Sequence, residues 1–225
     1  MQVVTFDIET DHYIPEEVKN VWCVVIKDHH TGKVSQYRPH QIRDAVRHLK
    51  RSDVVIGHNC IQFDIPVLRM KYGYEPKDKV VDTLIMSRTQ RPKRMSPPDC
   101  PNKKAPHSVE AWGYRLGRGK VVHEDWTQFS EDMLHRCTED VEIQYLIYEE
   151  LMKEAKGEGW MPAHKLNMKL FTHLQRQEYN GWTVDIDHVD RCINQLNRWI
   201  NMIDRSVVPL LPHKVEVLET KVKGE

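Results

Sequence analysis

Short apolar runs recur along the N-terminal part of the chain and predict β-strands. The run that begins at Val3 contains β-branched and aromatic side chains and predicts a buried strand through Thr10. Two further runs, residues 21–26 and 34–37, stand on either side of a turn that contains Gly32. This arrangement predicts an antiparallel hairpin or meander, so the chain opens with three strands.

Helical spacing of the apolar side chains begins after this meander. Apolar residues recur three and four positions apart in residues 41–51 and 65–72, which predicts two helices. Short apolar runs at residues 53–59 and 80–82 predict two further strands beside them. Strands that alternate with helices after an initial meander indicate an α/β fold, a mixed sheet flanked by helices.

Two longer helical patterns follow in the second half of the chain. One predicted helix covers residues 107–117, and a second begins after Ser130, which is a favourable N-cap residue. Glu131 and Asp132 place negative charge in the first turn of this second helix, where the helix dipole stabilises it. Its apolar positions continue to about residue 155.

The pattern changes after residue 155 and predicts a domain boundary. Two glycines mark a linker, and two more helical segments follow at residues 166–179 and 187–207. We therefore predict two domains: residues 1–158, with the mixed sheet, and residues 159–225, a short all-helical extension.

Residues 88–107 interrupt the periodic pattern and predict a long surface loop. Prolines and basic residues dominate this segment, and Asp99 is its only acid. One interpretation is a solvated insertion, and the other is a basic arm that contacts a phosphate backbone. The basic residues are Arg88, Arg91, Lys93, Arg94, Lys103 and Lys104.

Composition and charge narrow the class of protein. Of the 225 residues, 40% are hydrophobic and 29% charged, which is typical of a soluble globular protein with a sizeable core. The formal net charge is +0, so any attraction to nucleic acid must come from a local basic surface. Five widely spaced cysteines, no Cys-x-x-Cys pair, no signal peptide and no apolar span indicate a cytoplasmic protein without a membrane segment.

The first predicted strand carries two acids, Asp7 and Glu9. Side chains two positions apart point to the same face of a strand, so the two carboxylates lie side by side and repel each other. A cation stabilises such a pair, and oxygen ligands suit Mg²⁺ or Mn²⁺ better than softer metals. An isolated Asp-x-Glu is more often explained by one acid that caps a turn, so this motif does not decide alone.

Two later acids complete a set of four. Asp64 follows the fourth predicted strand, near the edge of the sheet where the first strand ends, and Asp140 lies inside the helix that begins after Ser130. Each has an ordinary explanation, because Asp64 could cap a helix and Asp140 could face solvent.

Taken together, the four acids resemble the pattern of the DEDD superfamily of 3′–5′ exonucleases, which have a ribonuclease-H-like fold. The matching motifs are Asp7-x-Glu9, then Asn59-x-x-x-Phe63-Asp64, then Asp140 in a late helix. The segments 107–117 and 82–84 are similar to the proofreading domain of phage-type family A DNA polymerases. Residues 181–185 are similar to the start of the polymerase portion of those enzymes.

The resemblance implies hydrolysis at the 3′ end of single-stranded DNA with release of nucleoside 5′-monophosphates. Two Mg²⁺ or Mn²⁺ ions about 3.5–4 Å apart would clamp the scissile phosphate. The resemblance implies that Asp7 bridges the ions, that Glu9 and Asp140 bind the ion on the side of the nucleophile, and that Asp64 holds the second. Asn59 and Phe63 would line the pocket of the terminal nucleotide, although Phe63 fits the hydrophobic core equally well.

The last motif departs from the phage polymerase pattern. Those enzymes carry a tyrosine four residues before the last acid, and this chain has Arg136 there. His135 stands five residues before Asp140, the spacing of a histidine that acts as general base in another branch of the superfamily. We assign His135 as tentative general base. One alternative is that His135 is an ordinary surface histidine. The other is that Arg136 is a local substitution and that the metals alone activate the water.

The extension resembles the start of a polymerase thumb, and the sequence ends before a palm or fingers. We therefore expect a polymerase partner chain, or a polymerase domain missing from this sequence. One rival hypothesis is a non-catalytic DNA-binding or assembly subunit, which the costly clustered acids disfavour. Another is an RNA-processing exonuclease of the same superfamily, against which the phage-like segments around Trp112 and Trp182 favour DNA.

Overall fold

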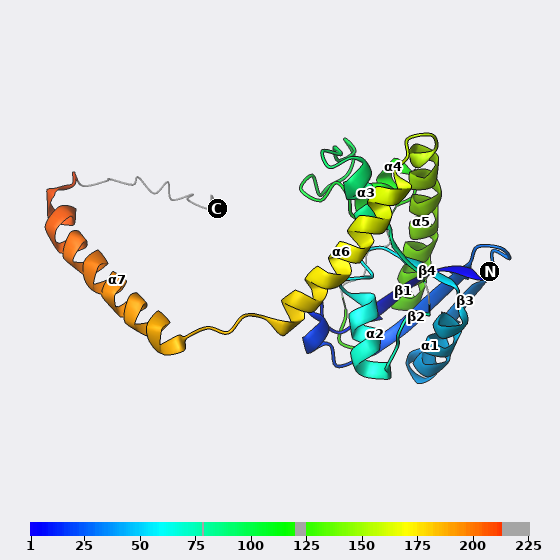
Figure 1. Ribbon diagram of the computed structural model, residues 1–225, viewed down its shortest axis with the longest axis horizontal. Coiled ribbons are helices and arrows are strands. Elements are labelled where there is room, and N and C mark those ends of the chain that lie inside the picture. Colours follow the sequence, from blue (N-terminus) through cyan, green and yellow to red (C-terminus); the bar gives the residue numbers. More distant parts are fainter. Residues whose placement is uncertain (78, 120–124, 213–225) are drawn as a thin grey trace, which may run out of the picture. The chain divides into compact units, whose positions relative to one another are not determined.

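A mixed five-stranded sheet forms the centre of the first part of the chain in the computed structural model, which describes residues 1–77, 79–119 and 125–212 (Figure 1). The strand order is β3-β2-β1-β4-β5, and the predicted α/β fold with a mixed sheet is confirmed. Pairing is antiparallel among β1, β2 and β3 and parallel from β1 through β4 to β5. The strands are β1 (Val3–Thr10), β2 (Val21–Asp28), β3 (Val34–Tyr37), β4 (Val54–Gly57) and β5 (Lys79–Asp82).

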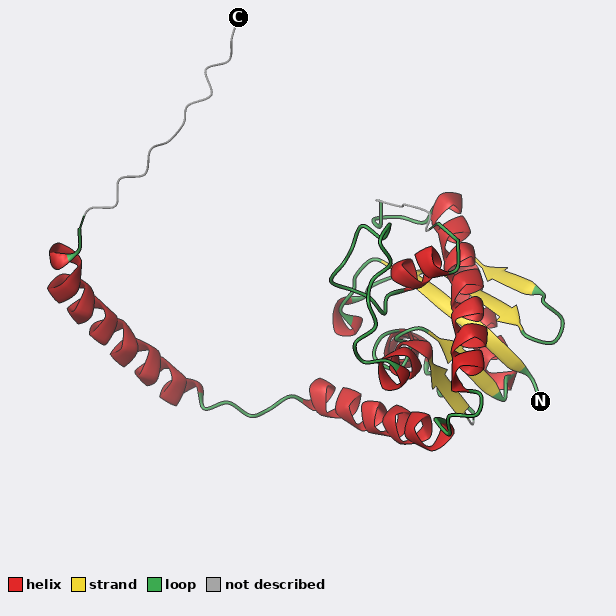
Figure 2. Cartoon of the chain, turned by 90° about the horizontal axis from the view of Figure 1, so that it is seen from above, coloured by secondary structure: helices red, strands yellow, loops and turns green. Residues whose placement is uncertain are grey.

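Helices cover both faces of this sheet (Figure 2). On one face, α1 (Ile42–Arg51) and α2 (Asp64–Tyr72) pack against the even-numbered side chains of β1, such as Phe6. On the other face lies α5 (Glu131–Ala155), whose buried side chains contact β2 and β4. α3 (Thr83–Gln90) and α4 (Val109–Arg115) pack against the second half of α5.

The basic proline-rich segment connects α3 to α4. Residues 88–90 complete the last turn of α3, so the loop begins three residues later than the sequence indicated. Residues 91–108 then run without regular helix or strand, as their prolines predict. The segment is not uniformly exposed, because Cys100 is buried and only 7% of the Arg94 side chain is exposed.

α6 (Met161–Asn180) belongs to the same compact unit as the sheet, which extends from Met1 to Tyr179. The side chains of Met168 and Phe171 pack against the core, and Asn167 Nδ2 donates to Thr89 Oγ1 at 2.9 Å. The helix starts five residues earlier than its apolar pattern suggested, because a proline is tolerated in the first turn. The unit therefore includes a helix that the sequence-based boundary at residue 158 assigns to the extension.

The second unit, Asn180–Glu225, contains α7 (Ile186–Val207). Asp185 caps this helix by accepting a hydrogen bond from the His188 N–H at 2.9 Å. Ile193, Leu196, Ile200 and other apolar side chains recur along α7 and are exposed. None of the helices described is long and apolar enough to cross a lipid bilayer.

Candidate active site

The alternation of side chains along β1 directs its two acids toward α5. Asp7 pairs across the sheet with Val25 of β2, and Glu9 pairs with Cys23. Both partners belong to the cluster that packs against α5, whereas the even-numbered residues of β1 face α1 and α2. The acids therefore lie between the central strand and the long helix.

α5 supplies the third acid and two further polar groups. Asp140 is 6% exposed and lies on the buried side of the helix, with Cys137 one turn before it and Gln144 one turn after it. Gln144 Nε2 donates a hydrogen bond of 2.7 Å to Asp7 Oδ1, and the Cys137 thiol lies 3.7 Å from Asp7 Oδ2. This face of α5 thus positions the Asp7 carboxylate from two directions.

Asp64 begins α2, directly after the loop that leaves β4. This loop starts at Gly57, where an added Cβ would stand 2.6 Å from Cys60 Cβ, so only glycine fits. Asn59 follows with a left-handed backbone (φ 64°), a conformation that asparagine tolerates. The tight turn brings the 4% exposed Asp64 side chain to the carboxyl end of β1.

Asp82 fixes the same loop from the neighbouring strand. Its carboxylate accepts hydrogen bonds from the backbone N–H groups of Asn59 and Ile61, at 3.0 and 3.1 Å. It also caps α3 through the N–H groups of Leu84 and Ile85. Four backbone donors occupy this carboxylate, which gives Asp82 a structural role.

The carboxylates act on one another electrostatically. Burial raises the pKa of Glu9 well above its ordinary value, and the negative charges of Asp7 and Asp140 raise it further. Burial also raises the pKa of Asp64, with Asp7 as the next cause, while the backbone amide of Ile8 opposes the shift. The four predicted acids therefore lie close enough to act on one another through Asp7 and Glu9, with Asp7 half-buried and the other three buried.

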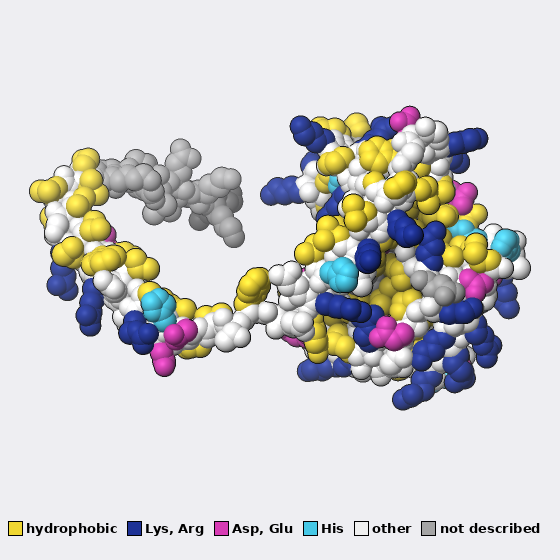
Figure 3. Space-filling model, in the orientation of Figure 1, with side chains coloured by type: hydrophobic (Ala, Val, Ile, Leu, Met, Phe, Trp, Pro, Cys, Tyr) yellow, Lys and Arg dark blue, Asp and Glu magenta, His cyan; other side chains and the backbone are white. Residues whose placement is uncertain are grey.

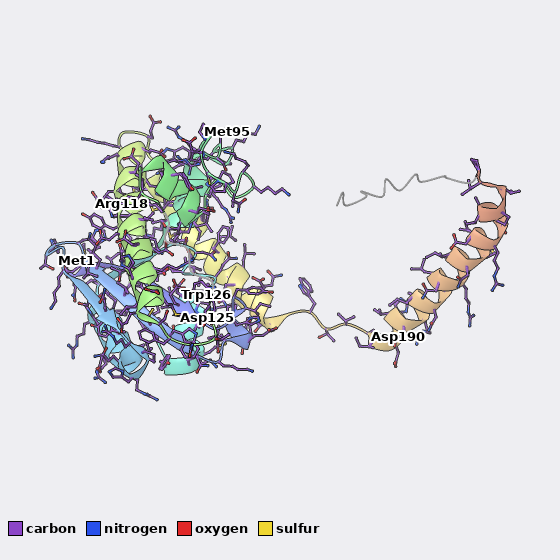
Figure 4. All side chains as sticks on the ribbon, turned by 180° about the vertical axis from the view of Figure 1, so that it is seen from behind. Met1, Met95, Arg118, Asp125, Trp126 and Asp190 are labelled. Carbon is purple, nitrogen blue, oxygen red and sulfur yellow. The ribbon has the colours of Figure 1, made fainter. Side chains whose placement is uncertain are left out.

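Arg136 lies within this cluster. Its Nε atom is 3.6 Å from Glu9 Oε1 and 3.8 Å from Asp140 Oδ2, and its side chain is 16% exposed. The guanidinium carbon stands 4.9 Å from the centre of the Trp126 ring, which is a cation–π contact. Figure 4 labels Trp126 near α5 and the strands. A fixed positive charge thus compensates part of the acidic charge.

His135 does not join the acids. Its side chain is exposed, on a helix that is continuous from Glu131. Helical residues advance by about 100° each, so a residue five positions before Asp140 lies about 140° away around the helix. A residue four positions before it, such as Arg136, falls on the same side. The geometry therefore does not support the tentative assignment of His135 as general base.

The two predicted substrate residues, Asn59 and Phe63, lie in the loop that precedes Asp64. Asn59 is half-buried, and its carbonyl oxygen accepts the Phe63 N–H at 3.1 Å. Phe63 is half-buried and packs against the hydrophobic core. Its ring therefore contributes to packing, and Asn59 offers the more polar surface next to the acids.

Two residues of this site were not predicted from the sequence. Gln144 is 1% exposed although it is polar, and Arg136 had been considered only as a substitution. A sequence signal existed for both, because each lies four residues from Asp140 and so on the same helical side.

The donor set fits a hard divalent cation. Carboxylate oxygens dominate it, and the ligand atoms of Asp7, Glu9 and Cys137 lie within 4.8 Å of one another. The pKa values of Glu9 and Asp64 are raised first by burial and then by neighbouring negative charges, and a bound cation would offset the effect of those charges. Among the described residues, this is the one such group of possible metal ligands.

The chain is similar in sequence to two phage DNA polymerases. The chain is 27% identical to the DNA-directed DNA polymerase of Enterobacteria phage T3 and 26% identical to that of Escherichia phage T7. The matches cover 66% and 68% of this chain but only 26% and 27% of the polymerases, so the chain spans about a quarter of their length. No protein-family model matches the chain.

Solved structures share the fold of the first unit. NrnC from Brucella melitensis superimposes with a TM-score of 0.62 at 21% identity, over 80% of this chain and 86% of NrnC. RNase D of Escherichia coli, an exoribonuclease, gives a TM-score of 0.57 at 16% identity over 78% of this chain and 45% of RNase D. The chain is thus related in sequence to the T3 and T7 DNA polymerases and has the ribonuclease-H-like fold of NrnC and RNase D.

Proposed function

We propose that this protein is a metal-dependent 3′–5′ exonuclease that removes nucleoside 5′-monophosphates from single-stranded DNA ends. The observation that carries this proposal is the cluster of Asp7, Glu9, Asp64 and Asp140, contributed by three separate elements, in which all but the half-buried Asp7 are buried. Clustered buried carboxylates oppose folding unless they bind cations, so their presence supports a catalytic use.

The four acids are the residues that would hold divalent ions, two Mg²⁺ or Mn²⁺ in this proposal. One structure of NrnC contains bound Mg²⁺, which supports this choice. Bound at these acids, such ions supply positive charge that polarises a phosphodiester and lowers the pKa of water. Gln144 orients Asp7, and Arg136 limits the repulsion between Glu9 and Asp140. Asn59 and Phe63 are proposed contacts for the terminal nucleotide, and no side chain of α5 is assigned as proton acceptor.

An RNA-processing exonuclease is the second candidate function. The fold similarity to RNase D, an exoribonuclease, favours it, whereas the sequence relation to two phage DNA polymerases favours DNA. We give more weight to the sequence relation, because a fold at 16% identity accommodates different substrates.

A proofreading role requires a polymerase, which we propose as the partner. This chain spans about a quarter of the phage polymerases, so a separate polymerase chain or a polymerase domain outside this sequence would provide the polymerase activity. The exposed apolar side chains of α7 are a suitable contact surface for it. The proposed place of action is the cytoplasm, with the replicating DNA.

The test compares mononucleotide release from 3′-labelled single-stranded DNA and RNA of the same sequence, with Mg²⁺, with Mn²⁺ and with EDTA. We expect DNA cleavage that requires the metal and falls by at least about 10³-fold in Asp7→Asn, since removing a core catalytic group has effects of this size. Asp44→Asn, an equal change on the exposed face of α1, serves as control. Activity that survives Asp7→Asn would contradict the site, and a preference for RNA would contradict the proofreading role.

A further inference from the structure

The basic segment that follows α3 encloses a second site. A cavity of about 800 Å³ is lined by Arg91, Pro92, Lys93, Arg94, Met95 and Arg115. Four of these six residues carry positive charge. Separate dark-blue Lys and Arg side chains project from the region around this segment in Figure 3, and Figure 4 labels Met95. We call this hollow the arginine cavity.

The walls of the arginine cavity are held in place. Arg94 donates two hydrogen bonds to the Glu154 carboxylate, at 3.0 and 2.7 Å, and its guanidinium stands 4.5 Å from the centre of the Trp112 ring. Arg115 stands 5.0 Å from the same ring and donates to the Met95 carbonyl oxygen at 2.6 Å. Because both guanidinium groups are fixed, a ligand would bind them without ordering flexible side chains.

Both guanidinium groups retain unused donors. Arg94 Nε and Arg115 Nη1 are buried and have no hydrogen-bond partner among the described residues. A buried donor without a partner is unfavourable, so an acceptor at either atom would be stabilising, and both residues line the arginine cavity. Planar guanidinium groups recognise phosphate particularly well.

The local charge also favours an anion. Burial lowers the pKa of Arg115, and the positive charge of Arg94 lowers it further. Glu154 is the acid paired with this group, and its carboxylate already contacts Arg94 and lies 3.8 Å from Arg91. One carboxylate thus faces four basic residues, so the arginine cavity keeps a net positive charge for a ligand.

The arginine cavity and the acid cluster lie along the same helix. Glu154 follows Asp140 by fourteen residues of α5, which corresponds to about 21 Å along the helix axis. A stacked single strand rises about 3.4 Å per nucleotide, so roughly six nucleotides would join the two places.

We propose that the arginine cavity binds a backbone phosphate of the nucleic-acid strand whose 3′ end occupies the acid cluster. This inference rests on the proposed function and extends it, because it assigns a second contact upstream of the cleaved end. It also gives the basic segment a role in substrate binding rather than that of a solvated insertion.

The test measures binding of 5′-fluorescent single-stranded DNA by anisotropy. EDTA is present so that a metal-dependent nuclease does not cleave the strand during the measurement. Arg91→Gln combined with Lys93→Gln removes two exposed charges of the arginine cavity, one of them 3.8 Å from Glu154, and keeps both Arg94–Glu154 hydrogen bonds. Lys50→Gln combined with Arg51→Gln removes two exposed charges from the end of α1 and is the matched control.

For a twelve-nucleotide strand, we expect the slope of log K against log salt to become less negative by about 1.4 in the cavity variant, about 0.7 for each lost contact. The ratio of the wild-type binding constant to that of the cavity variant should therefore decrease about sevenfold between 50 and 200 mM salt. A dinucleotide, which cannot span the distance, should bind the wild-type protein and the variant equally.

A third variant, Arg115→Lys, keeps the charge but loses the planar donors. It should weaken binding of the twelve-nucleotide strand with little change in salt slope. Equal slopes for the cavity variant and the α1 control would overturn the proposal. The proposal would also be overturned if an acidic peptide protected the basic segment from proteolysis and the oligonucleotide did not.

The outcome is separable from that of the nuclease assay. If the cavity variant changes DNA binding as expected but the wild-type protein has no nuclease activity, the arginine cavity stands and the proposed function is rejected. If the wild-type protein is an active nuclease but the cavity variant binds DNA with an unchanged salt slope, only the arginine-cavity proposal is rejected.

Discussion

At the scale of single residues, the acid cluster shows how one position can change the character of a site. The resemblance to phage polymerases places a tyrosine four residues before Asp140, and this chain places Arg136 there. Its guanidinium lies between Glu9 and Asp140 and stacks on Trp126, so it is a fixed cation inside an acidic cluster. A divalent ion at these acids must share the same charges with Arg136.

Arg136→Gln tests this charge balance. In EDTA, the free energy of unfolding should decrease by about 1–3 kcal/mol, because two buried carboxylates lose their positive neighbour. Mn²⁺ should bind the variant more tightly and raise its melting temperature more than that of the wild type, since the ion no longer competes with a cation. Thermal unfolding with and without Mn²⁺ measures both effects.

The control for Arg136 is Arg47→Gln, whose partner Asp44 is exposed on α1. That variant should change the free energy of unfolding by less than about 1 kcal/mol, as is typical of surface ion pairs. If Arg136→Gln and Arg47→Gln behave alike with and without Mn²⁺, Arg136 does not affect the acids.

At the scale of elements, the loop between β4 and α2 carries the site and is organised from outside. Asp82, at the end of β5, bonds two backbone N–H groups of this loop and two of the first turn of α3. The position of Asp64 therefore depends on a residue of the edge strand as well as on its own helix.

Asp82→Ala should lower the free energy of unfolding by about 3–5 kcal/mol. The reason is that several buried N–H groups lose their acceptor and α3 loses its cap. Urea unfolding measures the loss. Asp82→Asn keeps one acceptor oxygen and should be less destabilising. A change below about 1 kcal/mol in Asp82→Ala would show that other groups fix the loop.

At the scale of the whole molecule, the extent of the first unit is the main difference from the sequence-based boundary. α6 packs through Met168 and Phe171, and the Asp82 N–H lies 3.1 Å from Met168 Sδ. These contacts make α6 part of the body that contains the acids.

Shortened chains test the boundary. A chain that ends at Tyr179 should retain the stability of the first unit, as judged by its urea unfolding transition. A chain that ends at residue 158 should lose about 2–4 kcal/mol, because the apolar surface covered by Met168 and Phe171 becomes exposed. Equal stability of the two shortened chains would place the boundary at residue 158.

Much of this architecture follows from the sequence alone, because strand and helix periodicities depend on neighbouring residues. The period of two along β1 puts Asp7 and Glu9 on one face, whereas the sequence left open whether Asp140 faces the core or the solvent. The same helical period already separates His135 from Asp140. The prolines of residues 91–108 likewise exclude a regular element there.

Only the tertiary structure decides which of these faces meet. The contact of Gln144 with Asp7 joins residues 137 positions apart, and the approach of Asp64 to Asp7 depends on how β4 pairs with β1. The basic segment forms the wall of a cavity with Arg115 because Arg94 and Arg115 both pack on Trp112. Local pattern sets the direction of each side chain, whereas packing between distant segments sets its partners.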